Sequence, residues 1–243
     1  MQNQNNSKNT INSLLFGRIV AISIAVITLI TFGLSIIAIP ISGTNCIHNC
    51  VAYPYLNTSA QFPHDFLWMP VAIILTLTYL LFFISIHANA SEDNKIYSQV
   101  GLSLAIISTT IIIVDYYFQF TIIPSSLLNG ETEGLALFIQ YNPHGIFIAM
   151  EELGYIIMSL SFLAVAPVFT NITRKENIVH WINIISPIIL ILSFIIIYSK
   201  YGINRQYSFE IVAISINWLV FIIEGILINR IYNQKLHEIS PRA

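Results

Sequence analysis

Apolar residues fall into six long runs along the chain, separated by short polar segments. The runs cover residues 17–41, 66–87, 100–123, 144–169, 178–199 and 209–231. A helix needs about 20 mainly apolar residues to cross a bilayer, and every run meets that length. The runs are too long and too continuously apolar for the strands of a barrel, so they predict helices. The sequence therefore predicts an all-α integral membrane bundle of six transmembrane helices, spanning residues 17–232.

Two polar ends flank this predicted membrane domain. Residues 1–16 are mostly polar and rich in asparagine, which predicts a disordered tail. Residues 233–243 predict a short cytoplasmic tail that is too small to form a domain. The first apolar run is longer than the core of a signal peptide, so we expect a retained helix, with a cleaved signal peptide as the alternative.

The amino-acid composition of the chain also indicates a membrane protein. Of the 243 residues, 56% are hydrophobic and 9% are charged, against about 25% charged residues in a typical soluble domain. The net charge is −2 and no large basic patch is present, so we expect no nucleic-acid partner. No phosphate-binding loop, dinucleotide turn, hydrolase elbow or metalloprotease motif occurs, so no cofactor and no metal site is expected.

The basic residues predict the orientation of the helices. With the N-terminus in the cytoplasm, eight of the ten basic residues lie on the inner side and two on the outer side. The inner set is Lys8, Arg18, Lys95, Arg174, Lys175, Arg230, Lys235 and Arg242, and the outer set is Lys200 and Arg205. Cytoplasmic loops carry an excess of Lys and Arg, so we expect both termini in the cytoplasm.

Four acidic residues deep inside the apolar runs are the candidate functional groups. They are Asp115, Glu151, Glu152 and Glu224, and no basic residue lies at comparable depth within the runs. A carboxylate in hydrocarbon is costly, so each acid needs a partner, a proton or a wet cavity. For Glu224 we expect a structural ion pair with Arg18 or Arg230, with a second transport site as the alternative.

Asp115, Glu151 and Glu152 fall at one depth in the predicted hairpin of the third and fourth helices. Each lies about 12 Å below the outer edge, from the rise of about 1.5 Å per residue. Gln119 shares the helix face of Asp115, and His144 lies two turns above Glu151. These five residues predict an ion-binding column that opens outward. The two glutamates point about 100° apart, so we expect them to have different roles.

The column supports two interpretations. As a functional site it would bind protons or a cation, because no basic side chain neutralises it. As a structural feature it would be a set of neutral carboxylic acids that hydrogen-bond neighbouring helices.

The two cysteines, Cys46 and Cys50, lie in the first outer loop. In an oxidising compartment they could form a disulfide, whereas free thiols or a redox-active pair are the alternatives.

Several motifs resemble those of a group of uncharacterised multi-pass membrane proteins of bacteria and archaea. They are Phe62-Pro63-His64-Asp65-Phe66-Leu67-Trp68, Gly130-Glu131-Thr132-Glu133-Gly134, Tyr141-Asn142-Pro143-His144-Gly145 and Glu151-Glu152-Leu153-Gly154-Tyr155. The resemblance covers most of the chain after the N-terminal tail. It implies a membrane-protein fold and a location in a membrane, but it implies no activity.

We therefore expect a multi-pass protein of a prokaryotic cytoplasmic membrane. The leading hypothesis is a small permease or a proton- or cation-linked membrane protein that is not an enzyme. Its expected partners are the lipid bilayer and a small ion or lipid ligand, while the sequence leaves protein partners open. The alternatives are a membrane-embedded enzyme acting on a lipid or isoprenoid, and a non-catalytic accessory or sensor protein.

Overall fold

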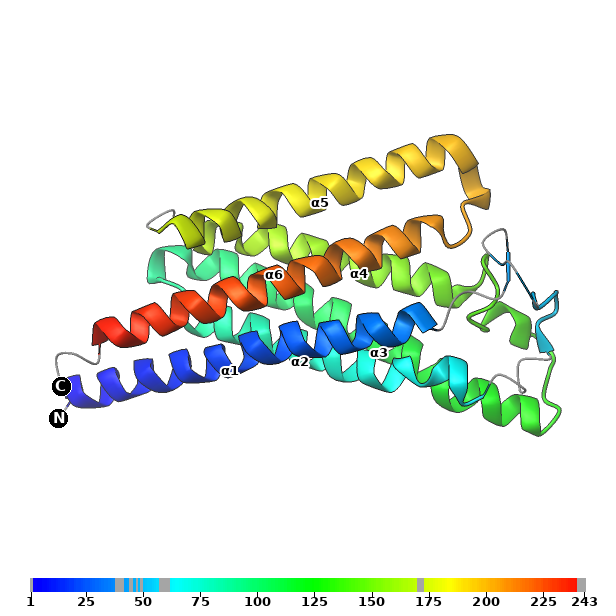
Figure 1. Ribbon diagram of the computed structural model, residues 1–243, viewed down its shortest axis with the longest axis horizontal. Helices are drawn as coiled ribbons and strands as arrows, with labels where there is room; N and C mark the ends of the chain where they lie inside the picture. The colour runs from blue at the N-terminus through cyan, green and yellow to red at the C-terminus, as the bar shows by residue number, and fades with distance from the viewer. Residues whose placement is uncertain are drawn as a thin grey trace.

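The computed structural model describes residues 2–37, 42–43, 46, 48, 50–56, 62–169 and 173–239. Within these residues, six α-helices are long and apolar enough to cross a membrane (Figure 1). They are α1 (Gln2–Ile37), α2 (Trp68–Ala88), α3 (Lys95–Leu128), α4 (Ile146–Val165), α5 (Arg174–Tyr201) and α6 (Ser208–Ile239). The predicted all-α bundle with six candidate membrane spans is confirmed.

The helices run up and down, so their connections gather at two ends of the bundle (Figure 1). We call the end with the α1–α2, α3–α4 and α5–α6 connections the loop end. The opposite end, where α1 begins and α6 ends, is the terminal end. Both chain ends therefore leave the bundle on the same side, as an even number of spans requires.

Five helices form the body of the bundle and α5 lies against its side. α1 packs against α2 and α6, α3 packs between α2 and α4, and α4 also contacts α6. Among the long helices, α5 packs mainly against α4 and α6. It runs along one edge of the molecule (Figure 1). Its outer face exposes Trp181, Ile188, Ile195 and Ile196, which suits contact with lipid.

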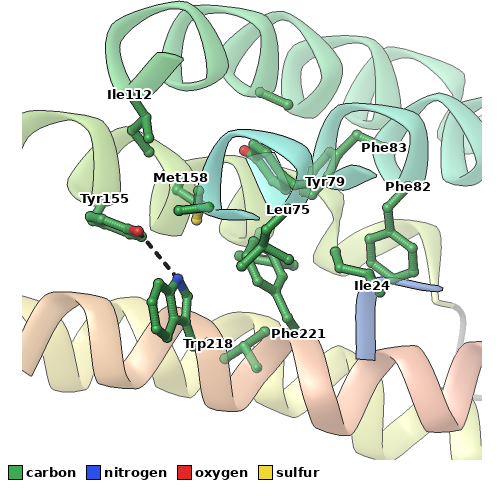
Figure 2. Close-up of a cluster of buried hydrophobic side chains, with 14 of the residues drawn as sticks. Ile24, Leu75, Tyr79, Phe82, Phe83, Ile112, Tyr155, Met158, Trp218 and Phe221 are labelled. Carbon is green, nitrogen blue, oxygen red and sulfur yellow. Dashed lines mark hydrogen bonds between the residues drawn. The ribbon is translucent and has the colours of Figure 1, made fainter. Parts of the chain in front are cut away.

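Aromatic side chains fill the centre of the bundle (Figure 2). The ring of Phe221 on α6 lies 5.4 Å from that of Tyr79 on α2 and 5.7 Å from that of Phe162 on α4. Phe83 on α2 packs 5.0 Å from Tyr79 and 5.3 Å from Phe162. We call these four residues the aromatic layer. All are at most 1% exposed, so the layer closes the space between α2, α4 and α6.

The predicted disordered tail is wrong for residues 2–16, which continue α1. The physical reason is visible in the contacts of its last residues. Leu14 is buried, and Ser13 Oγ donates to Asn89 Oδ1 at 3.0 Å just beyond α2. At the other chain end, α6 likewise continues to Ile239 through most of the predicted tail, whereas residues 240–243 lie outside the described residues.

Small residues allow a close contact between α1 and α6. A Cβ atom on Gly225 of α6 would lie 2.5 Å from the backbone oxygen of Ala21 on α1. Only a glycine therefore allows α1 and α6 to approach this closely. Glu224 immediately precedes Gly225 on α6, so this contact also fixes the depth at which its carboxyl group is held.

Candidate intramembrane carboxylate site

Three acidic side chains from three helices meet in the half of the bundle nearer the loop end. Asp115 comes from α3, Glu151 from α4 and Glu210 from α6, and all three are buried. Glu151 interacts electrostatically with both other carboxyl groups. We call these residues the carboxylate cluster. The structure brings together Asp115 and Glu151, as their equal depth in the α3–α4 hairpin predicted, and adds Glu210.

Glu151 is the most enclosed member of the carboxylate cluster, with 0% of its surface exposed. The groups that act on its charge are Asp115, Glu210, Tyr116 and Glu152, and none of them is basic. Within the described residues, neither of its carboxyl oxygens makes a hydrogen bond of normal geometry. Several negative charges this close together are unfavourable in a low-dielectric interior. The cluster can therefore hold a proton or a bound cation.

A row of aromatic polar groups leads from the carboxylate cluster toward the middle of the bundle. The hydroxyl groups of Tyr116 and Tyr155 lie 3.1 Å apart, and Tyr116 also faces Glu151. The indole Nε1 of Trp218 donates to the Tyr155 hydroxyl at 3.2 Å (Figure 2). A tyrosine hydroxyl can both donate and accept a hydrogen bond, so these side chains form a continuous hydrogen-bonded chain that begins beside the acids.

Glu152 forms an ion pair that the sequence analysis excluded. Arg205 Nε donates to Glu152 Oε1 at 3.0 Å, and Arg205 Nη2 donates to Glu152 Oε2. These hydrogen bonds raise the pKa of the Arg205 guanidinium, so it remains charged. The predicted absence of a basic partner is wrong for Glu152, because Arg205 folds back from the α5–α6 connection onto α4. Glu151 and Glu152 thus differ in environment, as their angular offset predicted.

A cavity of about 160 Å³ opens beside this ion pair at the loop end. It is lined by Pro143, His144, Gly145, Ile148, Ala149, Glu152, Ile203, Arg205 and Gln206. His144 precedes α4, which begins at Ile146 rather than at residue 144. Its side chain is exposed and its backbone N–H donates to Asn142 Oδ1 at 3.0 Å. His144 therefore lies at the rim of a cavity that reaches Glu152, not in a column above Glu151.

The side chain of Gln119 forms hydrogen bonds with the backbone of the α3–α4 connection. Its Nε2 donates to the carbonyl of Phe138, and its Oε1 accepts from the backbone N–H of Gln140 at 3.0 Å. Both polar ends of the amide are thereby used by the connection. Although Gln119 shares the buried face of Asp115, the structure places its functional atoms outside the carboxylate cluster.

Further polar contacts tie the connections of the loop end together. The Tyr141 hydroxyl donates to Asp65 Oδ2 at 2.8 Å, and His64 Nδ1 lies 2.8 Å from Asp65 Oδ1. Burial, together with the charge of Asp65, raises the pKa of Tyr141. Ser42 Oγ lies 2.5 Å from the hydroxyl of Tyr207, whose pKa is raised chiefly by burial. These contacts hold three connections over the carboxylate cluster.

Cys46 and Cys50 form a disulfide in the α1–α2 connection. The bond spans only four positions, so it constrains one turn of this connection rather than joining distant segments.

The ion pair predicted for Glu224 is wrong. Glu224 is fully buried on α6, and neither of its oxygens has a hydrogen-bond partner within the part of the chain that the structure describes. Arg18 Nε instead donates to Asn229 Oδ1 at 3.3 Å. Glu224 therefore remains a buried carboxyl group without a basic partner.

Glu210 and Arg205 are the residues of this site that the sequence analysis missed. Both lie at the edge of the last apolar run, where a charged residue is ordinarily taken for an interfacial one. One signal was available for Glu210, which lies seven residues before Asn217 and fourteen before Glu224. That spacing places all three on one face of a helix.

Comparison with known proteins adds nothing to this geometry. No family model, no curated protein and no solved structure matches the chain.

Proposed function

We propose that the protein is a multi-pass membrane protein that binds and releases protons at the carboxylate cluster, as a small permease or proton-linked carrier. The observation that carries this proposal is the environment of Glu151. Its carboxyl group is fully buried, lies beside Glu210 and Asp115, and has no basic neighbour among the residues that the structure describes. Intramembrane acids that face the interior of a bundle commonly mark proton or ion pathways.

A proton suits this cluster better than a coordinated metal. No group of three His, Cys, Asp or Glu side chains in the described ranges is arranged to hold a metal ion. Neighbouring carboxyl groups without cations share protons instead, as paired carboxylates in enzyme active sites do. A monovalent cation held by two of the carboxylates is the other form of the same proposal.

We place the loop end outside a prokaryotic cytoplasmic membrane. Eight of the ten basic residues then lie on the cytoplasmic side, as the distribution of Lys and Arg in membrane proteins favours. The Cys46–Cys50 disulfide supports the same orientation, because disulfides persist in oxidising compartments. The cavity at Glu152 and Arg205 would then face the outside and end at the residue that follows Glu151 in α4.

A sensor of external pH is the second candidate function. It is favoured by the aromatic layer, in which Tyr79, Phe162 and Phe221 close the interior between the cluster and the terminal end. A lipid-modifying enzyme has less support. The two apolar pockets that open beside α5 have Ser159 and Ser186 among their few polar residues and include none of the acids.

The test is an infrared difference titration of the full chain in lipid. Wild type should show a carboxyl band that titrates within the accessible pH range, and Glu151→Gln should remove it. Glu131→Gln is the matched control, because Glu131 is an exposed acid of the α3–α4 connection. A wild-type carboxyl band that stays constant over the accessible pH range would contradict the proposal and favour neutral, structural carboxylic acids.

A further inference from the structure

One face of α6 carries three buried polar side chains at equal spacing. Glu210, Asn217 and Glu224 are seven residues apart, and none is more than 9% exposed. Seven residues are close to two helical turns and advance about 10 Å along the axis. The three side chains therefore form a line that descends from the carboxylate cluster toward the terminal end. We call it the α6 polar line.

The upper half of the α6 polar line is joined to the carboxylate cluster through α4. Asn217 Nδ2 donates to the carbonyl of Tyr155 at 3.2 Å, and Ser159 Oγ donates to Asn217 Oδ1 at 3.0 Å. Tyr155 is also the residue whose hydroxyl meets Tyr116 beside Glu151. Polar groups thus lie at short intervals from the acids to the middle of the bundle.

The lower end of the α6 polar line is Glu224, a carboxyl group with no explanation in the packing. It is fully buried, and neither of its oxygens has a hydrogen-bond partner among the residues that the structure describes. Two polar groups of the neighbouring helices are engaged elsewhere. Arg18 of α1 bonds Asn229, and Tyr79 of α2 bonds Ser161 at 2.7 Å.

On α5, Asn183 is also buried, and its amide has no hydrogen-bond partner among the described residues, so α5 offers one uncharged polar group on the side that packs against α6. On α5, the acid Glu176 pairs with Lys235 at 3.3 Å, beyond Glu224 toward the terminal end. On α1, the atoms nearest to the adjacent Gly225 belong to Ala21, Ile24 and Ala25. A carboxyl group kept in such surroundings is destabilising, and intramembrane acids of this kind are retained for function.

The aromatic layer lies between Asn217 and Glu224. Phe221 follows Asn217 by four residues and precedes Glu224 by three, so it shares their side of α6. Its ring packs against that of Tyr79 (Figure 2). It also packs against the ring of Phe162. An apolar constriction of this kind blocks ions and protons as long as it excludes water.

We propose that Glu224 is a second proton-binding site and that the α6 polar line carries protons between it and the carboxylate cluster, with Phe221 as the gate. This inference rests on the proposed function of the cluster and extends it to the other half of the bundle. Protons enter from the loop end at Glu210 and Glu151, pass the Asn217 level, and reach Glu224 when water enters the aromatic layer. Buried waters that bridge unpartnered polar groups complete such a path.

The experiment measures proton flux into proteoliposomes that contain the full chain and an entrapped pH dye. A pH difference drives the flux, and potassium with valinomycin holds the membrane potential at zero. The variants are Glu224→Gln, Glu151→Gln, Glu224→Asp and the matched control Glu238→Gln, which removes an exposed acid from the same helix. Helix content and the infrared carboxyl bands of each variant are recorded in parallel.

We expect wild-type flux above that of empty liposomes, a loss of at least tenfold in Glu224→Gln and Glu151→Gln, and no change in Glu238→Gln. Glu224→Asp retains a carboxyl group and should keep part of the flux, which a purely structural role would not predict. Wild-type flux in Glu224→Gln, or no wild-type flux at all, would overturn the relay. Either result leaves the carboxylate cluster to be judged by its own infrared titration, so the two proposals fail separately.

Discussion

Arg205 in the α5–α6 connection holds Glu152 of α4 through two parallel hydrogen bonds, one residue away from the unpaired Glu151. The pair ties a connection of the loop end to the helix that carries the centre of the carboxylate cluster. It also neutralises the one acid of this region that the cavity reaches. Two consecutive glutamates thereby acquire different roles, since one anchors a connection and the other faces the interior.

Breaking this ion pair should destabilise the protein. Arg205→Gln leaves the Glu152 carboxylate buried without a partner, and we expect a loss of about 2 kcal/mol. The loss is below that of a fully buried pair because 26% of the Arg205 side chain is exposed. The measurement is unfolding in detergent micelles, monitored by circular dichroism. The double variant Arg205→Gln/Glu152→Gln should recover most of the loss, and equal losses in single and double variants would contradict the coupling.

Gln119 should affect stability without affecting the carboxylate cluster. Gln119→Leu removes the partners of the Phe138 carbonyl and the Gln140 N–H, which costs about 1–3 kcal/mol when such groups stay buried. The titrating infrared band of the cluster should remain as in wild type. A shifted or missing band in this variant would mean that the amide reaches Asp115 after all.

Depth along a helix was the part of the site that could be predicted from the sequence. Counting residues from the ends of the α3–α4 hairpin placed Asp115 and Glu151 at one level, and the structure brings them together. The six helices followed from the apolar runs for the same reason, since length and composition decide which segments can cross a bilayer.

Contacts between helices that are distant in the sequence could not be predicted in this way. Glu210 reaches Glu151 because α6 packs against α4, and no periodicity in a single chain states which helices become neighbours. Arg205 lies in a connection, whose path is set by local turns rather than by a helical repeat. Glu224 shows the converse error, because a nearby basic residue in the sequence did not become its partner.

The hydrogen bond between Tyr141 and Asp65 gives the loop end a dependence on alkaline pH. Tyr141→Phe removes a hydrogen bond to a charged acceptor and should cost about 1.5–3 kcal/mol at neutral pH. Because the pKa of Tyr141 is raised in the folded protein, the unfolded chain loses its proton first, near pH 10. The stabilisation is therefore complete below pH 10 and declines above it, by about 1.4 kcal/mol for each further unit of pH.

The check on Tyr141 compares wild type and Tyr141→Phe in chemical unfolding at several pH values. The difference in the free energy of unfolding should be constant between pH 7 and pH 9, by about the amount given above, and should shrink above about pH 10. A difference that grows with pH would show that the tyrosinate, not the neutral hydroxyl, is the form that the fold favours.

Gly225 should be the position where the bundle tolerates least added volume. A new Cβ atom would lie 2.5 Å from the backbone oxygen of Ala21, and a backbone atom cannot move aside as a flexible side chain can. Gly225→Ala should therefore push α1 and α6 apart and cost about 1–3 kcal/mol, despite the better helix propensity of alanine. Gly33→Ala on α1 is the matched control, because nothing lies within 4 Å of its added Cβ atom. Thermal unfolding in micelles should show a lower midpoint for Gly225→Ala and an equal or higher one for Gly33→Ala. Equal unfolding midpoints for the two variants would contradict the close approach of α1 and α6 at Gly225. They would also contradict the tight enclosure of the adjacent Glu224.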